Sequence, residues 1–118
     1  MGNKKITQHV LRDDIIIINP GRTLDNDNSL EMAEAISNAK RQRYKYVIID
    51  MVHLEFLSSA GVGSILGTME MIREGGGDII ICNASRAILH VFEVLDLTDY
   101  LTIKANENEA VAVCDIGA

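Results

Sequence analysis

Short apolar runs alternate along the chain with longer segments whose apolar residues recur at helical spacing. Residues 15–18, 46–49 and 79–82 are apolar at every position, which is typical of strands buried on both faces of a parallel sheet. Residues 6–11 are expected to form a weaker edge strand and residues 101–103 a short strand. The polar segment 21–28 is rich in residues that hydrogen-bond their own backbone, so it is expected to be a loop.

Four helices are predicted to follow these strands. The first covers residues 29–42, with Asn28 as N-cap and Glu31 completing a capping box. The second opens within residues 58–63 and ends at three successive glycines, 75–77, while Asn83 and Asn106 are expected to cap the third and fourth. The apolar positions expected to face the core are Leu30, Ala33, Ile36 and Ala39, then Val62, Ile65, Leu66, Met69 and Ile72, then Ala84, Ile88, Val91, Phe92 and Leu95, and finally Ala110 and Val113.

This order of elements predicts one α/β domain over residues 1–118. Strands that are apolar throughout and alternate with helices favour a mostly parallel or mixed sheet. We expect four to five strands and about four helices. The length suits a single core, because a typical domain has roughly 100–200 residues.

Composition excludes several classes of function. Eleven Lys and Arg against seventeen Asp and Glu give a net charge of 11 − 17 = −6, which disfavours binding to nucleic acid or to an anionic membrane surface. The longest hydrophobic run is five residues, at 110–114, where a membrane span needs about 20. The N-terminal residues lack the apolar segment of a signal peptide, so a cytoplasmic protein is expected, with Cys82 and Cys114 as buried thiols.

The residues that usually carry catalysis do not fall into a catalytic pattern. The glycines at 61–67 and 75–77 lack the spacing and the lysine of a phosphate-binding loop. The three histidines, His9, His53 and His90, lie at no metal-ligand spacing, and neither Ser58 nor Ser59 sits in a hydrolase elbow. We therefore expect no enzyme activity, no metal and no cofactor.

Ser59 lies where the chain enters the second predicted helix, among small residues. A phosphate attached there would meet the free N–H groups of the first helical turn and the positive end of the helix dipole. The position is therefore suited to reversible phosphorylation. The alternative is that Ser58 and Ser59 only cap the helix.

The sequence resembles the STAS domain family, which includes bacterial anti-sigma factor antagonists and the C-termini of sulfate transporters. Residues 56–66, FLSSAGVGSIL, resemble the family signature F-[apolar]-D-S-[ST]-G-L-G followed by apolar residues. The loop GRTLD at 21–25 and the strand VIID at 47–50 resemble the family's G-x-[L]-D loop and its central strand. Similar segments follow in order at 76–82, 91–97 and 107–112, so the resemblance covers nearly the whole chain.

The resemblance implies a switch protein that is not an enzyme. Unphosphorylated, it would bind a GHKL-type serine kinase that also acts as an anti-sigma factor. That kinase would phosphorylate Ser59, and a PP2C-type phosphatase would reverse the reaction.

The implied partner surface is the start of the second helix together with the loop before the first. Its residues are Asp25, Ser58, Ala60, Gly61 and Gly63. The two glycines are expected to keep this surface low, and the Asp25 loop is expected to lie beside Ser59. Two residues depart from the signature: Ser58 replaces its Asp and Ala60 its second Ser or Thr. The alternative function is a STAS scaffold subunit of a signalling or transport assembly that is never phosphorylated.

Overall fold

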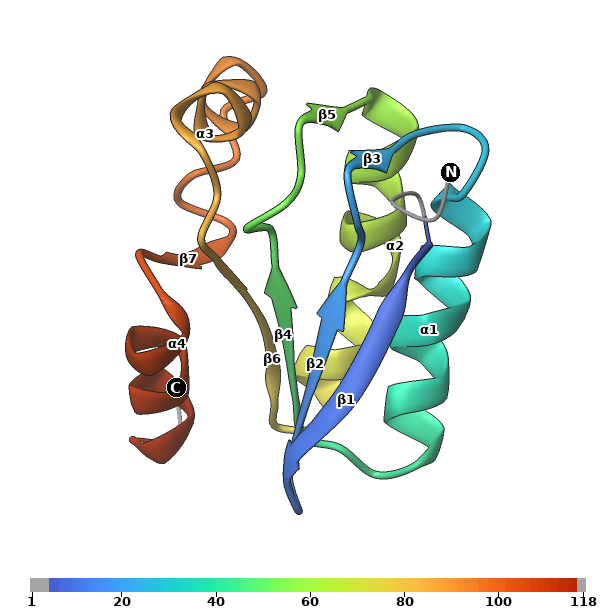
Figure 1. The fold of residues 1–118 in the computed structure, drawn as a ribbon. Helices are drawn as coiled ribbons and strands as arrows, with labels where there is room; N and C mark the ends of the chain where they lie inside the picture. Colours follow the sequence, from blue (N-terminus) through green and yellow to red (C-terminus); the bar gives the residue numbers. More distant parts are fainter. Residues whose placement is uncertain (1–4, 117–118) are drawn as a thin grey trace.

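Five strands form one mixed sheet, with helices on both of its faces (Figure 1). The computed structural model describes residues 5–116. The order across the sheet is β1-β2-β4-β6-β7, and only β1 runs antiparallel to its neighbour. These strands are β1 (Thr7–Arg12), β2 (Ile15–Asn19), β4 (Tyr46–Asp50), β6 (Asp78–Cys82) and β7 (Thr102–Lys104).

The helices divide between the two faces and one end of the sheet. They are α1 (Ser29–Arg41), α2 (Ser59–Glu74), α3 (Arg86–Val94) and α4 (Glu107–Asp115). The first two pack side by side on one face, α4 lies on the other, and α3 lies beyond the carboxyl ends of the strands (Figure 1). Two further strands, β3 (Thr23–Leu24) and β5 (Phe56–Leu57), pair in parallel as a small ribbon at that same end.

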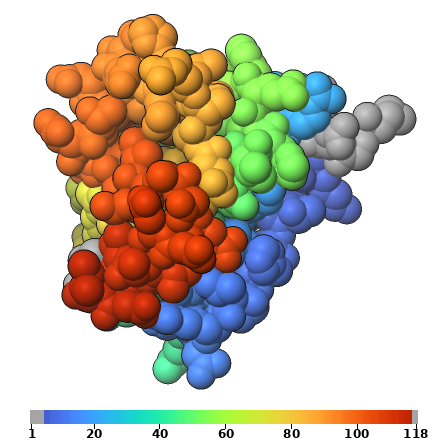
Figure 2. Space-filling model, turned by 60° about the vertical axis from the view of Figure 1, so that its left-hand side comes forward, coloured from blue at the N-terminus to red at the C-terminus, as the bar shows by residue number. Residues whose placement is uncertain are grey.

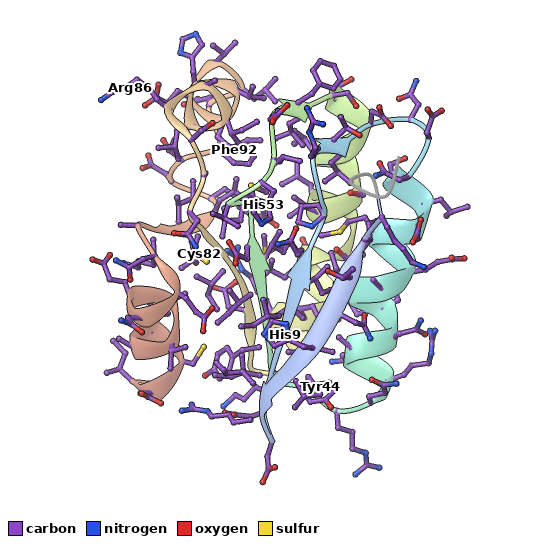
Figure 3. All side chains as sticks on the ribbon, viewed as in Figure 1. His9, Tyr44, His53, Cys82, Arg86 and Phe92 are labelled. Carbon is purple, nitrogen blue, oxygen red and sulfur yellow. The ribbon has the colours of Figure 1, made fainter. Side chains whose placement is uncertain are left out.

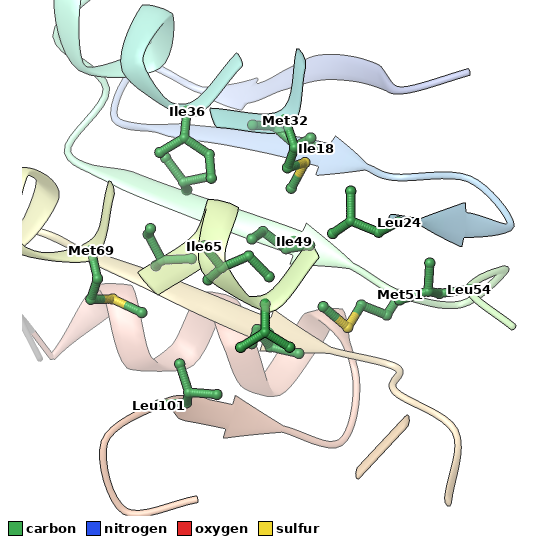
Figure 4. Packing of buried hydrophobic residues seen from close by; sticks show 14 of the residues in the cluster. Ile18, Leu24, Met32, Ile36, Ile49, Met51, Leu54, Ile65, Met69 and Leu101 are labelled. Atoms are coloured by element: carbon green, nitrogen blue, oxygen red, sulfur yellow. The ribbon is translucent and has the colours of Figure 1, made fainter. Parts of the chain in front are cut away.

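The core has two parts because successive strand residues point to opposite faces. Ile16 and Ile18 of β2 belong to the larger cluster, which packs toward α1 and α2, and Figure 4 shows Ile18 within it. Ile15 and Ile17 pack with residues of α4. All four isoleucines are at most 2% exposed, which explains why this strand is apolar at every position.

The predicted fold class and the strands at 15–18, 46–49 and 79–82 are confirmed. The edge strand, the short strand after α3 and the last helix with its Asn106 cap are also confirmed. Cys82 and Cys114 lie buried as free thiols, as expected. Among the described residues, no helix is long and apolar enough to cross a bilayer.

One predicted helix cap is confirmed only in its position, and another is wrong. Asn28 is the N-cap of α1 but makes no side-chain cap bond, because its Oδ1 accepts from Asp25 N and its Nδ2 donates to the Thr23 carbonyl oxygen. Asn83 has a left-handed backbone, φ 59°, and its side chain donates to Asp50, so α3 begins later, with Ser85 as its N-cap.

Two predicted core positions and one predicted loop also need correction. Leu30 is 71% exposed and Leu95 is 45% exposed, while Met32 fills the core position on α1. Segment 21–28 is not wholly a loop, since it contains β3.

Candidate functional site

The β3–β5 ribbon holds the loop after β2 against the start of α2. Thr23 pairs with Phe56 and Leu24 with Leu57. Beyond the paired residues, Ser58 N donates to the Leu24 carbonyl oxygen over 3.0 Å. Asp25 follows directly on β3 and Ser59 directly on Ser58, so the predicted proximity of this loop to the start of α2 is confirmed.

The two serines at this junction have different roles. Ser58 is the N-cap of α2, with an extended backbone and an Oγ that accepts from Gly61 N at 3.2 Å. Ser59 is the first helical residue and is exposed to solvent. The capping alternative therefore accounts for Ser58, while Ser59 presents its hydroxyl group at the surface beside the first free N–H groups of the helix.

The two glycines of this turn also differ. A Cβ on Gly61 would lie 2.5 Å from the Leu24 carbonyl oxygen and 2.9 Å from Leu57 Cδ1. Gly61 is buried, so the expectation that it lowers the outer surface is wrong; it allows the ribbon to approach α2 closely. Gly63 is exposed with nothing within 4 Å of a Cβ, and Ala60 is half-buried.

Hydrogen bonds within the loop fix the position of Asp25. Its carboxylate oxygen accepts from Asp27 N at 2.9 Å, and its backbone N–H donates to Asn28 Oδ1 at 2.9 Å. Its carbonyl oxygen accepts from the N–H groups of Asn28 and Ser29, at the start of α1. The partly exposed Asp25 carboxylate is therefore held on an ordered turn at the same end of the molecule as Ser59.

Exposed apolar side chains also lie at this end. Phe56 on β5 is 54% exposed and Leu30 in the first turn of α1 is 71% exposed. The sequence pattern does not assign either residue to a surface, since helical spacing places Leu30 in the core and Phe56 stands only within the family signature. Large exposed apolar side chains at a polar surface are a feature of protein-binding sites.

Asp50, at the end of the central strand, connects two loops at this edge of the sheet. Its Oδ1 accepts from Val52 N at 3.1 Å and from Asn83 Nδ2 at 3.0 Å. Asp50 thus joins the segment leading to β5 with the segment leading to α3, and has a structural role.

The histidines and cysteines of the described residues lie on different elements of the fold. His9 lies on β1 and His53 in the loop after β4 (Figure 3). Burial raises the pKa of Cys82 to about 12 and that of Cys114 to about 11, so neither thiol is activated. Within residues 5–116, no group of three His, Cys, Asp or Glu side chains is placed to hold a metal ion.

Comparisons with known proteins find relatives in sequence and in fold. The STAS domain family matches residues 7–110. An anti-sigma F factor antagonist of Paenibacillus polymyxa is 24% identical over 106 residues, covering 86% of this chain and 88% of that protein.

The structure of the anti-sigma factor antagonist SpoIIAA in its unphosphorylated form superposes with a TM-score of 0.80 at 25% identity, covering 97% of this chain and 98% of that one. The phosphorylated form of SpoIIAA, described as a Bacillus cell fate determinant, gives a TM-score of 0.72 at 25% identity, covering 92% of this chain and 97% of that one. Since the family match covers most of the chain and the solved structures share its fold, the protein belongs to the STAS domain family.

Proposed function

We propose that the protein is an anti-sigma factor antagonist controlled by phosphorylation of Ser59. In its unphosphorylated form it binds a GHKL-type serine kinase that also acts as an anti-sigma factor, and this displaces the sigma factor. The kinase transfers a phosphoryl group from its own ATP to Ser59 and releases the protein. A PP2C-type phosphatase restores the binding form.

The observation that carries this proposal is the different placement of the two serines. The Ser58 hydroxyl oxygen accepts the cap bond of α2, whereas Ser59 is exposed in the first turn. A gap-free match to the family signature supports Ser59 as the phosphoacceptor. The similarity to SpoIIAA, which is known in a phosphorylated form, supports the same chemistry.

A phosphate on Ser59 would act on binding and leave the fold intact. It adds about −1.5 to −2 charges, which the N-terminus of α2 tolerates in the free protein. In a complex the same charge is desolvated and faces the partner surface. A penalty of about 3 kcal/mol lowers affinity roughly 10²-fold, since each decade corresponds to about 1.4 kcal/mol.

Calorimetric titration against the kinase tests the proposal. Ser59→Glu is expected to weaken binding at least tenfold while leaving the thermal midpoint nearly unchanged. Asn108→Glu is the matched control, because it adds the same charge to an exposed position in the first turn of α4. Asp25→Ala is expected to weaken binding, and Asp13→Ala, in the turn at the opposite end of β2, is its control.

Mapping the phosphate by mass spectrometry tests the acceptor directly. After incubation with the kinase and ATP, the phosphate is expected on Ser59 in the wild type and in Ser58→Ala, and to be absent in Ser59→Ala. Phosphate on Ser58 with Ser59 unmodified would contradict the assignment.

One observation favours a second candidate function. Ser58 stands where the family signature has Asp, which removes a charge that a kinase partner could contact. A STAS scaffold subunit that is never phosphorylated would fit this change. If Ser59→Glu binds the partner as tightly as the wild type, the scaffold function replaces the switch.

A further inference from the structure

An open hollow of about 940 Å³ lies at the carboxyl edge of the sheet. Four segments of the chain form it: the start of β1, the turn after β2, the loop after β4 and the N-cap of α3. Figure 2 shows the segment after β4 between α3 and the N-terminal strands on this side of the molecule. The lining includes Lys5, Asn19, Arg22, Val52, His53, Glu55 and Ser85.

The polar side chains of this hollow are mainly hydrogen-bond donors. Lys5 and His53 are exposed and take part in no ion pair among residues 5–116. The Asn19 side-chain oxygen is already used, because it accepts from Gly21 N at 2.9 Å. The Ser85 Oγ accepts from Ile88 N at 3.2 Å, which leaves its hydroxyl hydrogen to donate.

The charge of the hollow has the opposite sign to that of the whole protein. Arg22 and Glu55 form an ion pair at 2.8 Å and cancel one another. The Lys5 charge is then left in excess, in a chain whose net charge is −6. Val52, which is 52% exposed, adds an apolar wall.

From this combination we propose that the hollow binds a small organic anion through carboxylate or phosphate oxygens. Lys5 and His53 contact the anionic group, Ser85 donates a further hydrogen bond, and Val52 contacts the carbon part of the ligand. The volume lies within the roughly 300–1,000 Å³ typical of small-molecule sites. Because these contacts come from side chains, the site needs no glycine-rich phosphate loop.

This hollow shares no lining residue with the surface proposed to bind the kinase. Arg22 and Glu55 precede the two strands of the β3–β5 ribbon, whereas Asp25 and Ser59 follow them. Anion binding is measured on the unphosphorylated protein alone, so this test requires neither the kinase nor the proposed phosphorylation of Ser59.

Titration followed by ¹H–¹⁵N NMR at constant ionic strength tests the proposal. The probes are inorganic phosphate and, separately, citrate, which distinguish a phosphate site from a carboxylate site. Saturable shifts are expected for the amides of Gly21, His53 and Ser85 with at least one probe. Lys5→Gln and His53→Gln are each expected to weaken binding at least fivefold.

Lys104→Gln and His90→Gln are the matched controls, since both residues lie outside the hollow. Both controls are expected to bind like the wild type. The proposal is overturned if neither probe gives saturable shifts in the millimolar range, or if the control substitutions weaken binding as much as Lys5→Gln and His53→Gln do.

Discussion

Replacing Gly61 and Gly63 by alanine, one at a time, tests how the β3–β5 ribbon packs against α2. The two positions lie in the same helical turn, and both substitutions add one methyl group. A Cβ on Gly61 would lie 2.5 Å from the Leu24 carbonyl oxygen, whereas a Cβ on Gly63 would meet nothing within 4 Å. The structure therefore predicts opposite effects on stability.

The magnitudes follow from two competing terms. Alanine is more favourable than glycine inside a helix by about 1 kcal/mol. Overpacking costs about 1–3 kcal/mol, and at Gly61 the upper end applies because the close atom belongs to the backbone. Gly61→Ala is expected to lower the free energy of unfolding by about 2 kcal/mol, and Gly63→Ala to raise it by about 0.5–1 kcal/mol.

Urea unfolding monitored by circular dichroism measures both values in the free protein. The m-value is expected to stay constant, which would show that the substitutions change stability and leave the unfolded state unaltered. Equal effects of the two substitutions would refute the argument. A stabilised Gly61→Ala protein would show that β3 does not pack against α2 as closely as described.

Three further predictions concern local interactions. Ser58→Ala is expected to lower the free energy of unfolding by about 1 kcal/mol because it removes the α2 cap, and Ser59→Ala to change it by less than about 0.5 kcal/mol, as urea unfolding would show. A hydrogen bond from Arg12 holds the pKa of the Asp14 carboxyl group below its usual value. The Asp14 carboxylate therefore stabilises the fold at pH values above its unfolded pKa, and this contribution is lost as pH falls. The difference in stability between the wild type and Asp14→Asn should therefore be present at pH 7 and decrease as pH falls below about 4. Cys82 and Cys114 are buried with raised pKa values of about 12 and 11, so a thiol reagent at pH 8 is expected to label them only after guanidinium unfolding.

The sequence predicted best those elements whose pattern depends on burial alone. β2, β4 and β6 are apolar at every position because both faces of the sheet are covered, so their positions could be read directly. Helix caps were less predictable, since an Asn side chain can bond the helix or another partner. Asn106 caps α4, whereas Asn83 bonds Asp50, 33 residues away in the sequence, and that contact exists only in the folded protein.

The part of the site that the sequence could not predict is the β3–β5 ribbon. Each of its strands has two residues, too few for a periodic pattern, and their pairing joins segments that are 33 positions apart. The proximity of Asp25 to Ser59 was nevertheless expected, because the carboxyl ends of parallel strands meet at one edge of a sheet. The reason for a glycine at position 61 was predicted incorrectly, since it depends on that same pairing.

The replacement of the family's Asp by Ser58 has one consequence for structure and another for electrostatics. Serine and aspartate are about equally favourable as N-caps, and the Ser58 Oγ makes the cap bond to Gly61 N. The exchange therefore leaves the start of α2 ordered and removes only a negative charge next to Ser59. A phosphate on Ser59 would then meet less repulsion within this protein, and the penalty it imposes on binding would come mainly from desolvation and from the partner surface. Ser58→Asp should thus leave stability nearly unchanged, and any change in kinase affinity would report the contribution of that charge alone.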